Sequence, residues 1–203
     1  MHKALSNIGK FFIALLLLAG PLSSLTLSRE IFSDAPFIPH TEKTKFGSYL
    51  AKNITYQPVQ KLKKEIEGAY GLTLLDRGEA HITVVTPIEY EKIQAILDIS
   101  EINQLAQNIQ SFAFQVLCVG KGEVELDGTK EKTLFVVVES ENLKNLRRAI
   151  KQRYLEKGGE TSKFDAEDFY PHITVGYTKR DLHASDGVFK DQRTCFDYPT
   201  IVP

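Results

Sequence analysis

The tetrapeptide His81-Ile82-Thr83-Val84 occurs a second time as His172-Ile173-Thr174-Val175. Each copy lies in a short run rich in β-branched residues, 81–87 and 171–177, which predicts a β-strand. Residues i and i+2 of a strand share a face, so each copy places its His and Thr on one side and its aliphatic residues on the other. The repeat therefore predicts two strands, each with an imidazole and a hydroxyl opposite a side that faces the core.

The alternative is that these histidines are structural, because a His in a strand often packs without taking part in chemistry. Two features favour a functional role. The chain has only five His, and two of them occupy equivalent positions of the repeat. The flanks also correspond, because a loop with turn residues or Pro precedes each His, at 77–80 and at 169–171. We therefore interpret the polar residues of the repeat as a candidate site.

The second copy, in full Phe169-Tyr170-Pro171-His172-Ile173-Thr174-Val175-Gly176, together with the first resembles the two-histidine (2H) phosphoesterase superfamily. That superfamily includes bacterial 2′-5′ RNA ligase-like proteins and 2′,3′-cyclic nucleotide phosphodiesterases, and the resemblance spans roughly 45–178. It implies an α+β fold of two pseudo-symmetric lobes that enclose a central cleft, each lobe an antiparallel sheet with helices on its outer face. It also implies the roles of four residues: catalytic His81 and His172, and substrate-binding Thr83 and Thr174.

These residue types suit phosphodiester chemistry. Cleavage needs a base for the attacking group, an acid for the leaving oxygen, and donors for the non-bridging oxygens. His can fill either proton-transfer role near neutrality, and Thr hydroxyls can donate to the phosphate. The expected function is metal-independent hydrolysis of 2′,3′-cyclic phosphates, or of related small nucleotide or RNA-end phosphodiesters, by two-His acid/base catalysis. By resemblance, His172 is the base.

We expect no cofactor and no metal, because the chain lacks the spacings His-x-His, His-Glu-x-x-His and Cys-x-x-Cys. Three other functions stay open. The same site could run in reverse, as an RNA 2′-5′ ligase-type activity. The protein could be a non-catalytic exported module that binds a phosphate or nucleotide. It could also be a membrane-tethered interaction protein in which the four polar residues are structural.

The composition, 42% hydrophobic and 25% charged, is typical of a globular protein. The net charge of −1 lacks the basic excess with which proteins bind long nucleic acid. Small nucleotides or RNA ends are therefore the expected substrates, and long duplexes are not expected partners. We expect a monomer.

The N-terminus has the pattern of a targeting segment. Lys3 and Lys10 precede the apolar run Phe11–Ala19, and Gly20-Pro21 and small residues follow. We assign 1–28 to a signal peptide, which predicts a periplasmic or secreted protein. The alternative is an uncleaved signal anchor that attaches the protein to the membrane through residues 11–27, although the apolar run is shorter than the roughly 20 residues of a membrane span.

The rest of the chain is assigned to a linker or arm, 29–44, and to one 2H phosphoesterase-like domain, 45–203, with lobes of approximately 45–110 and 111–185. The lobe boundaries rest on a duplication in which each half shows a helix and then a His-x-Thr strand.

The first half is expected to contain one strand, one long helix and two short helices. These are a strand at 46–55, a helix with Pro58 at its first position that ends at Gly71, and helices at 89–98 and 100–109, the last capped by Ser100.

The second half is expected to contain a hairpin and a helix before the second motif strand. These are strands at 112–119 and 133–139 around an Asp127-Gly128 turn, and a helix capped by Ser140 and closed by Gly158-Gly159.

Several other residues keep two interpretations. Cys118 and Cys195 could pair, but their spacing does not decide it. His183 is expected in a surface loop, and His40 in the arm. Three aromatic residues near the second motif could stack a base or pack in the core: Phe169, Tyr170 and Tyr177.

Overall fold

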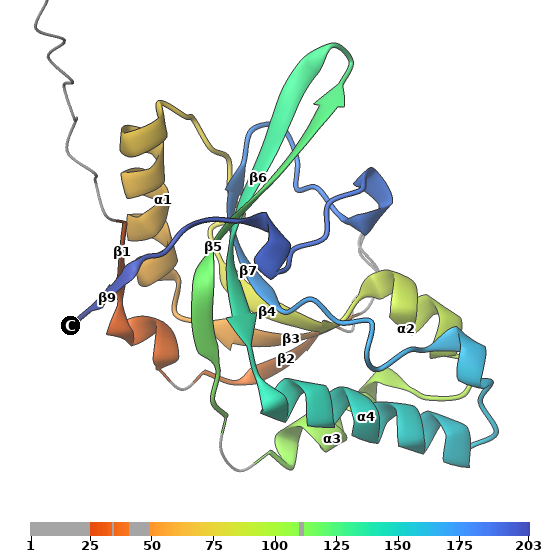
Figure 1. Ribbon diagram of the computed structural model, residues 1–203. Helices are drawn as coiled ribbons and strands as arrows, with labels where there is room; N and C mark the ends of the chain where they lie inside the picture. Colours follow the sequence, from red (N-terminus) through yellow and green to blue (C-terminus); the bar gives the residue numbers. More distant parts are fainter. Residues whose placement is uncertain (1–24, 34, 41–48, 110–111) are drawn as a thin grey trace, which may run out of the picture.

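The computed structural model describes residues 25–33, 35–40, 49–109 and 112–203. Its helices are α1 (Tyr56–Tyr70), α2 (Pro87–Ile93), α3 (Ile99–Gln107) and α4 (Glu141–Glu156). Its strands are β1 (Thr26–Ser28), β2 (Phe37–His40), β3 (Tyr49–Ile54), β4 (Ala80–Val85), β5 (Gln115–Leu126), β6 (Thr129–Glu139), β7 (His172–Tyr177), β8 (Cys195–Asp197) and β9 (Thr200–Val202). An antiparallel sheet combined with helices confirms the predicted α+β class (Figure 1).

Strands from both halves of the chain form one seven-stranded sheet among the described residues, in the order β2-β3-β4-β7-β6-β5-β8. The two strands that carry the repeated tetrapeptide, β4 and β7, are neighbours in its middle. The same order of elements occurs twice in the chain: two strands, then a helix, then a strand that carries the motif. It is β2-β3-α1-β4 in the first half and β5-β6-α4-β7 in the second. The expectation of a separate sheet in each half is therefore wrong in this respect, because β4 pairs with β7 and joins the halves. Two lobes around a central cleft stay a prediction.

The helices begin and end close to the expected positions. Gly71, with a φ of 61°, ends α1, and Thr55 precedes its first residue, so Pro58 lies two residues further into the helix than predicted. The Ser140 hydroxyl accepts from the Leu143 N–H at the start of α4, as predicted. The cap of α3 differs from the expectation: the Asp98 carboxylate accepts from the N–H of Ser100, which is itself helical.

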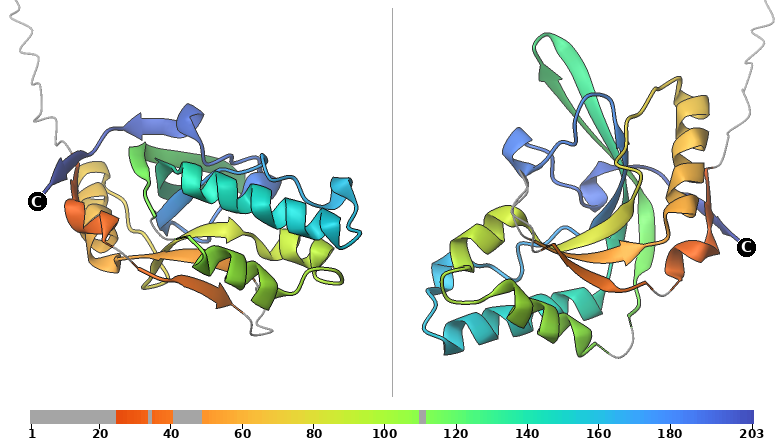
Figure 2. Two further views of the ribbon diagram at one scale, coloured as in Figure 1. Left: turned by 90° about the horizontal axis from the view of Figure 1, so that it is seen from below. Right: turned by 180° about the vertical axis from the view of Figure 1, so that it is seen from behind.

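The helices and the aliphatic sides of the motif strands share one core. Ile82 and Ile173 are fully buried and belong to one cluster with the buried residues of all four helices. α3 and α4 lie side by side at one end of the molecule, and α1 lies apart from them (Figure 2). The apolar residues of the tetrapeptide thus point into this core, which leaves its polar residues on the opposite face.

A second, smaller core lies on that opposite face. Phe135 and Val137 of β6 pack there with Cys118 and with Leu182 and Val188 from the segment after β7. Two glycines of β5 permit this close approach: a methyl group added at Gly122 would lie 2.2 Å from Cγ1 of Val188, and one at Gly120 would lie 2.9 Å from Oγ1 of Thr194. The C-terminal segment therefore packs directly on the sheet.

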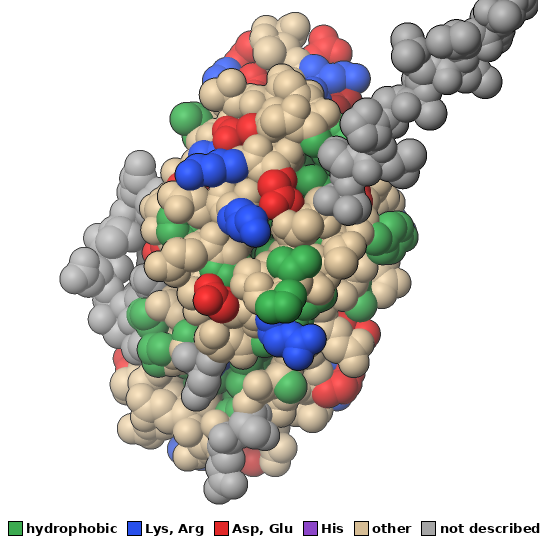
Figure 3. All heavy atoms as spheres, turned by 90° about the vertical axis from the view of Figure 1, so that its left-hand side faces the viewer, with side chains coloured by type: hydrophobic (Ala, Val, Ile, Leu, Met, Phe, Trp, Pro, Cys, Tyr) green, Lys and Arg blue, Asp and Glu red, His purple; other side chains and the backbone are tan. Residues whose placement is uncertain are grey.

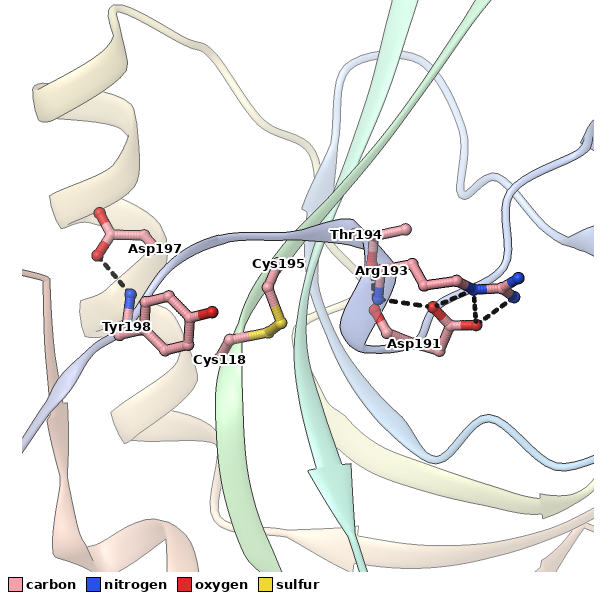
Figure 4. The surroundings of a disulfide bond; sticks show 7 residues. All are labelled: Cys118, Asp191, Arg193, Thr194, Cys195, Asp197 and Tyr198. Carbon is pink, nitrogen blue, oxygen red and sulfur yellow. Dashed lines mark hydrogen bonds and ion pairs between the residues drawn. A yellow bond between two sulfur atoms is a disulfide. The ribbon is translucent and has the colours of Figure 1, made fainter.

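A disulfide fixes this segment to the sheet. Cys118 of β5 is bonded to Cys195 of β8, 77 positions later in the chain (Figure 4). The sequence left this pairing open, and the structure resolves it. Asp191 and Arg193 form an ion pair shortly before Cys195, at the exposed side of the same segment (Figure 4).

The hairpin of β5 and β6 is longer than predicted and projects from the body of the molecule (Figure 1). Its turn is at Asp127-Gly128, as expected, with φ values of 53° and 74°. The additional strand residues lie near the tip, where charged side chains occupy both strands. The residues added to β6, 129–132, contain no apolar side chain, and for this reason the sequence pattern began this strand too late.

The N-terminal boundaries differ from those expected. Thr26–Ser28, which we assigned to the targeting segment, forms β1 and pairs in parallel with β9, and Leu27 is fully buried. Within the expected arm, Arg29–Phe32 forms a 3₁₀ helix and β2 forms the edge of the sheet. Their apolar side chains lie in or against the main core, which a free linker would not do. Residues 1–24, which include the apolar run, lie outside the described residues.

The face near α1 and the C-terminus carries interspersed acidic and basic side chains, with hydrophobic side chains between them (Figure 3). A membrane-spanning helix was sought in the part of the chain that the structure describes, and none of its helices has the required length and apolarity.

Candidate active site

The pairing of β4 with β7 determines the geometry of the site. Ile82 lies opposite Ile173, so in this antiparallel pair His81 lies across from Thr174, and Thr83 across from His172. All four polar side chains share the face opposite the helices, and each is half-buried between fully buried neighbours. The structure therefore brings together the four predicted site residues in one patch on adjacent strands.

The ring of His172 is fixed in a defined orientation. Its Nδ1 lies 2.7 Å from the carbonyl oxygen of Tyr170. Because a carbonyl oxygen only accepts, Nδ1 carries the hydrogen and donates it, which leaves the lone pair of the neutral ring on Nε2. The ring also contacts Phe135 edge-on, with centroids 5.9 Å apart. The fixed tautomer and ring orientation suit a proton acceptor.

Burial and a neighbouring cation keep His172 uncharged. Burial lowers the pKa of His172 to about 3, and the positive charge of Lys190 acts in the same direction. A pKa far below neutrality means that the imidazole is neutral at physiological pH. A neutral ring with Nε2 available is the form that a general base requires.

The surroundings of His81 are different. Its Nδ1 lies 3.6 Å from a carboxylate oxygen of Glu79, and its ring centroid lies 6.1 Å from that of Tyr49. Glu79 precedes β4, and Asn53 of β3 pairs with His81 across the sheet. A carboxylate beside the imidazole can accept its Nδ1 hydrogen and orient the ring. The two histidines thus have different electrostatic surroundings, a carboxylate for one and an ammonium group for the other.

Thr174 adjoins a buried ion pair that the sequence analysis missed. Asp181 accepts from Lys190 Nζ at 2.7 Å and from the Thr133 hydroxyl at 2.6 Å. Thr174 Oγ1 lies 3.3 Å from the second oxygen of Asp181 and 3.4 Å from Lys190 Nζ. No sequence pattern marks this pair, because Asp181 and Lys190 occur among other charged residues in an irregular segment.

Both members of this pair have perturbed pKa values. Burial lowers the pKa of Lys190, although Asp181 opposes that shift. The pKa of Asp181 is held well below its ordinary value by Lys190 and by the hydroxyl of Thr133, against the opposing effect of burial. The net direction keeps Asp181 ionised, so a charged pair lies beside Thr174.

The remaining candidates of the sequence analysis fall outside this patch or at its edge. His183 is exposed, as expected of a surface loop residue. Phe169 packs against the main core and lies 4.8 Å from the guanidinium of Arg147, so its role is packing. Tyr170 forms an edge-on pair with Phe189, whose ring is partly exposed. The side chain of His40 is outside what the structure describes.

A cavity of about 180 Å³ lies between the end of β6, the loop before β7 and the C-terminal segment, and none of the four motif residues lines it. Its lining includes Tyr170, Pro171, Lys190 and Val137, and Val137 pairs with His172 across the sheet. No group of three or more His, Cys, Asp or Glu among the described residues could hold a metal ion. The described site therefore offers proton-transfer groups, hydroxyls and one buried cation.

An oriented imidazole and a second His on the adjacent strand, each next to a Thr, form the arrangement expected of the two-histidine class. Comparison with protein families identifies the same class: the model described as "Swiss Army Knife, 2H phosphoesterase domain" matches residues 48–183. The chain belongs to this 2H phosphoesterase family, as the resemblance of its motifs implied. Comparisons with curated proteins and with solved structures find no match.

Proposed function

We propose that this phosphoesterase is a metal-independent phosphodiesterase that hydrolyses 2′,3′-cyclic phosphates or related small nucleotide and RNA-end phosphodiesters. The observation that carries the proposal is the pairing of Ile82 with Ile173, which aligns both His-x-Thr pairs on one face of the sheet. Family membership supports phosphoester chemistry, and the substrate class is our inference from the site.

In the proposed reaction His172 Nε2 takes a proton from the attacking water while the water oxygen bonds to phosphorus. The bond from phosphorus to one ribose oxygen breaks, and His81 gives its proton to that oxygen. The Thr hydroxyls stabilise the charge on the non-bridging oxygens. Support for His172 as the base comes from its Nδ1 contact with the Tyr170 carbonyl and from its lowered pKa.

The arrangement of the molecule around the substrate is part of the proposal. We infer that the two halves act as two lobes with the substrate phosphate held between them, which is supported by their repeated connectivity and by the pairing of β4 with β7. We infer that the cavity lined by Tyr170, Pro171 and Lys190, which adjoins the residues before His172, receives part of the group attached to the phosphate.

The decisive experiment is a screen of 2′,3′-cyclic nucleotides and of RNA oligomers that end in a cyclic phosphate, with EDTA present throughout. We expect turnover in EDTA. His81→Ala and His172→Ala should each lower the rate by about 100-fold or more, because each removes a proton-transfer group. Thr83→Ala and Thr174→Ala should cost less, since each removes one hydrogen bond. Arg148→Ala is the control, because this exposed side chain of α4 pairs with Glu167 and Asn145, and it should leave the rate near that of the wild type.

The screen also separates the other functions. Near-wild-type rates in either variant of the motif histidines would refute the two-His mechanism. Activity that EDTA abolishes and a divalent ion restores would refute metal independence. Tight binding of a cyclic nucleotide without turnover would favour the non-catalytic binding module. Joining of a 5′-hydroxyl end to a cyclic-phosphate end would reveal the reverse, ligase-type reaction.

A further inference from the structure

A buried ammonium group lies behind the hydroxyl of Thr174. The side chain of Lys190 is only 3% exposed, and its Nζ lies 2.7 Å from Asp181 and 3.4 Å from Thr174 Oγ1. Nζ also lies 5.5 Å from the centre of the Phe135 ring. Lys190 therefore extends from the C-terminal segment to Thr174, on the face of the sheet that carries the candidate site.

Stability alone does not account for this pair. Burying two charges costs several kcal/mol per ion, and apolar residues of similar size often stabilise a protein equally well or better. The segment is already attached to the sheet by the disulfide and by the packing of Val188 and Leu182. A charged pair at this point, next to a candidate substrate-binding hydroxyl, indicates a role in the site.

The hydrogen bonds determine which way Thr174 can donate. An ammonium group only donates, so in the 3.4 Å contact with Lys190, itself longer than an ordinary N–H···O bond, Thr174 Oγ1 is the acceptor and its own hydrogen points elsewhere. Its present acceptor is Asp181, at 3.3 Å, which is long for an O–H···O bond. The stronger bonds of Asp181 go to Lys190 and Thr133, at 2.7 and 2.6 Å. A phosphate oxygen on the open side would therefore compete easily for the Thr174 hydrogen.

We infer that Lys190, held by Asp181, is a positioning residue: it orients the Thr174 hydroxyl as a donor to the substrate phosphate and stabilises the phosphate charge through that hydroxyl. The inference rests on the proposed function for its substrate. It assigns to the buried pair a part in binding the phosphate, while proton transfer stays with the two histidines.

The electrostatics of the site agree with this assignment. The charge of Lys190 helps to lower the pKa of His172, so the field of the ammonium group extends to the motif side chains. Asp181 and His183 also face His172, and Arg77, from the loop before β4, acts on Lys190. A phosphate placed between the motif strands would lie within the same field.

The test is a double-mutant cycle of Lys190→Met and Thr174→Val, read by the affinity for inorganic phosphate and by kcat and KM for a 2′,3′-cyclic nucleotide. In the wild-type background K190M should weaken phosphate binding and lower kcat/KM by about ten- to a hundred-fold, since it removes a charge-assisted hydrogen bond. In the T174V background the same change should cost less than about threefold, because Lys190 acts through Thr174. Lys190→Arg should restore part of the loss.

Thr133→Val is the matched control, because it removes a buried hydrogen bond to Asp181 without touching Thr174. It should lower the melting temperature while leaving phosphate affinity within about threefold of the wild type. If Lys190 had a purely structural role, K190M would lower phosphate affinity equally in the wild-type and T174V backgrounds, and the loss of affinity would follow the loss of stability. Equal losses would overturn the inference. If K190M does not fold, the cycle is run with K190R, whose loss must likewise shrink in the T174V background.

Phosphate affinity, measured by titration calorimetry, separates this inference from the proposed function. Turnover that is unchanged in K190M would leave the function intact and overturn the inference. A wild-type protein that hydrolyses no cyclic nucleotide, yet binds phosphate in a Lys190-dependent way, would overturn the function and keep the inference. A wild-type protein that does not bind phosphate would overturn the inference.

Discussion

Single residues of the site differ in what they offer chemically, although the two tetrapeptides are identical. His172 donates from Nδ1 to the Tyr170 carbonyl and adjoins the ammonium group of Lys190, whereas His81 adjoins the carboxylate of Glu79. One imidazole is therefore held neutral, and the other has an anionic neighbour. This asymmetry supports different roles for the two histidines, and the motif alone did not reveal it.

The lowered pKa of His172 predicts how stability depends on pH. The unfolded chain binds a proton at this His below about pH 6.5, whereas the folded protein does so only near pH 3. Between these values the unfolded state holds more protons, so the free energy of unfolding falls as the pH falls. Above about pH 6.5 His172 has no such effect.

Between pH 6.5 and 4.5 the free energy of unfolding should fall less in His172→Gln than in the wild type, and the difference between the two falls should be about 1–3 kcal/mol. Urea unfolding at several pH values measures it. The pKa of His183 is lowered as well, so His183→Gln serves as the comparison and reports its separate share. Parallel pH curves for the wild type and His172→Gln, or an NMR titration of His172 near pH 6.5, would contradict the assignment.

At the scale of elements, the segment after β7 completes the site. It crosses the face opposite the helices, carries Asp181 and Lys190, and packs on β5 and β6 through Val188. The glycines of β5 leave room for it, and the disulfide attaches its end. The strands supply the motif residues, and this irregular segment supplies the charged groups beside Thr174.

A side chain at Gly122 should displace this segment. Gly122→Ala places a methyl group 2.2 Å from Val188 Cγ1, so Val188 has to move. We expect a loss of about 1–3 kcal/mol in stability and a rise in KM, because Lys190 follows Val188 by two residues. Gly128→Ala is the control. An added methyl group there meets no atom within 4 Å, so this substitution tests only the strain of an Ala at a φ of +74°, in the turn of the same hairpin. An unchanged KM in Gly122→Ala would show that the segment tolerates the shift.

At the scale of the whole molecule, Arg147 of α4 links the two halves. Its guanidinium is 1% exposed and donates to the Val84 carbonyl of β4 and to Glu89 of α2. It also donates to carbonyls of Asp165, Ala166 and Asp168, in the loop that leads to β7. One side chain thus joins the first motif strand to the loop before the second.

Arg147→Leu should destabilise the protein by about 3–5 kcal/mol, because it leaves several buried acceptors and Glu89 without their donor. Chemical denaturation measures this loss. Arg148→Leu on the same helix is the control: its pair with Glu167 is exposed, so we expect a change of less than about 1 kcal/mol. Equal effects of the two substitutions would refute this linking role.

Export is a further prediction at this scale. We expect the mature protein to lie outside the cytoplasm and to begin at or before Leu25, because Leu25 and Leu27 are buried in the core. The Cys118–Cys195 disulfide supports this, since disulfides persist mainly in oxidising compartments. Mass spectrometry of the native protein checks both the N-terminus and the pairing. Full-length protein with free thiols in the cytosol would contradict the proposal.

The sequence by itself determined the α+β class, most of the helices and strands, and the four polar residues of the motifs. The helices and strands follow from local periodicity, because strand alternation and helix capping act over a few residues. Ser140, Gly71 and the Asp127-Gly128 turn were identified for the same reason. The four polar residues and the α+β class follow from the repeated tetrapeptide and from the resemblance to the two-histidine superfamily.

Only the tertiary structure decided that both halves share one sheet, that Cys118 pairs with Cys195, and that Lys190 and Asp181 contact Thr174. These features join residues that lie apart in the chain, 77 positions apart for the two Cys. Local patterns carry no information about such contacts, because the contacts depend on which surfaces the chain buries together once its elements pack.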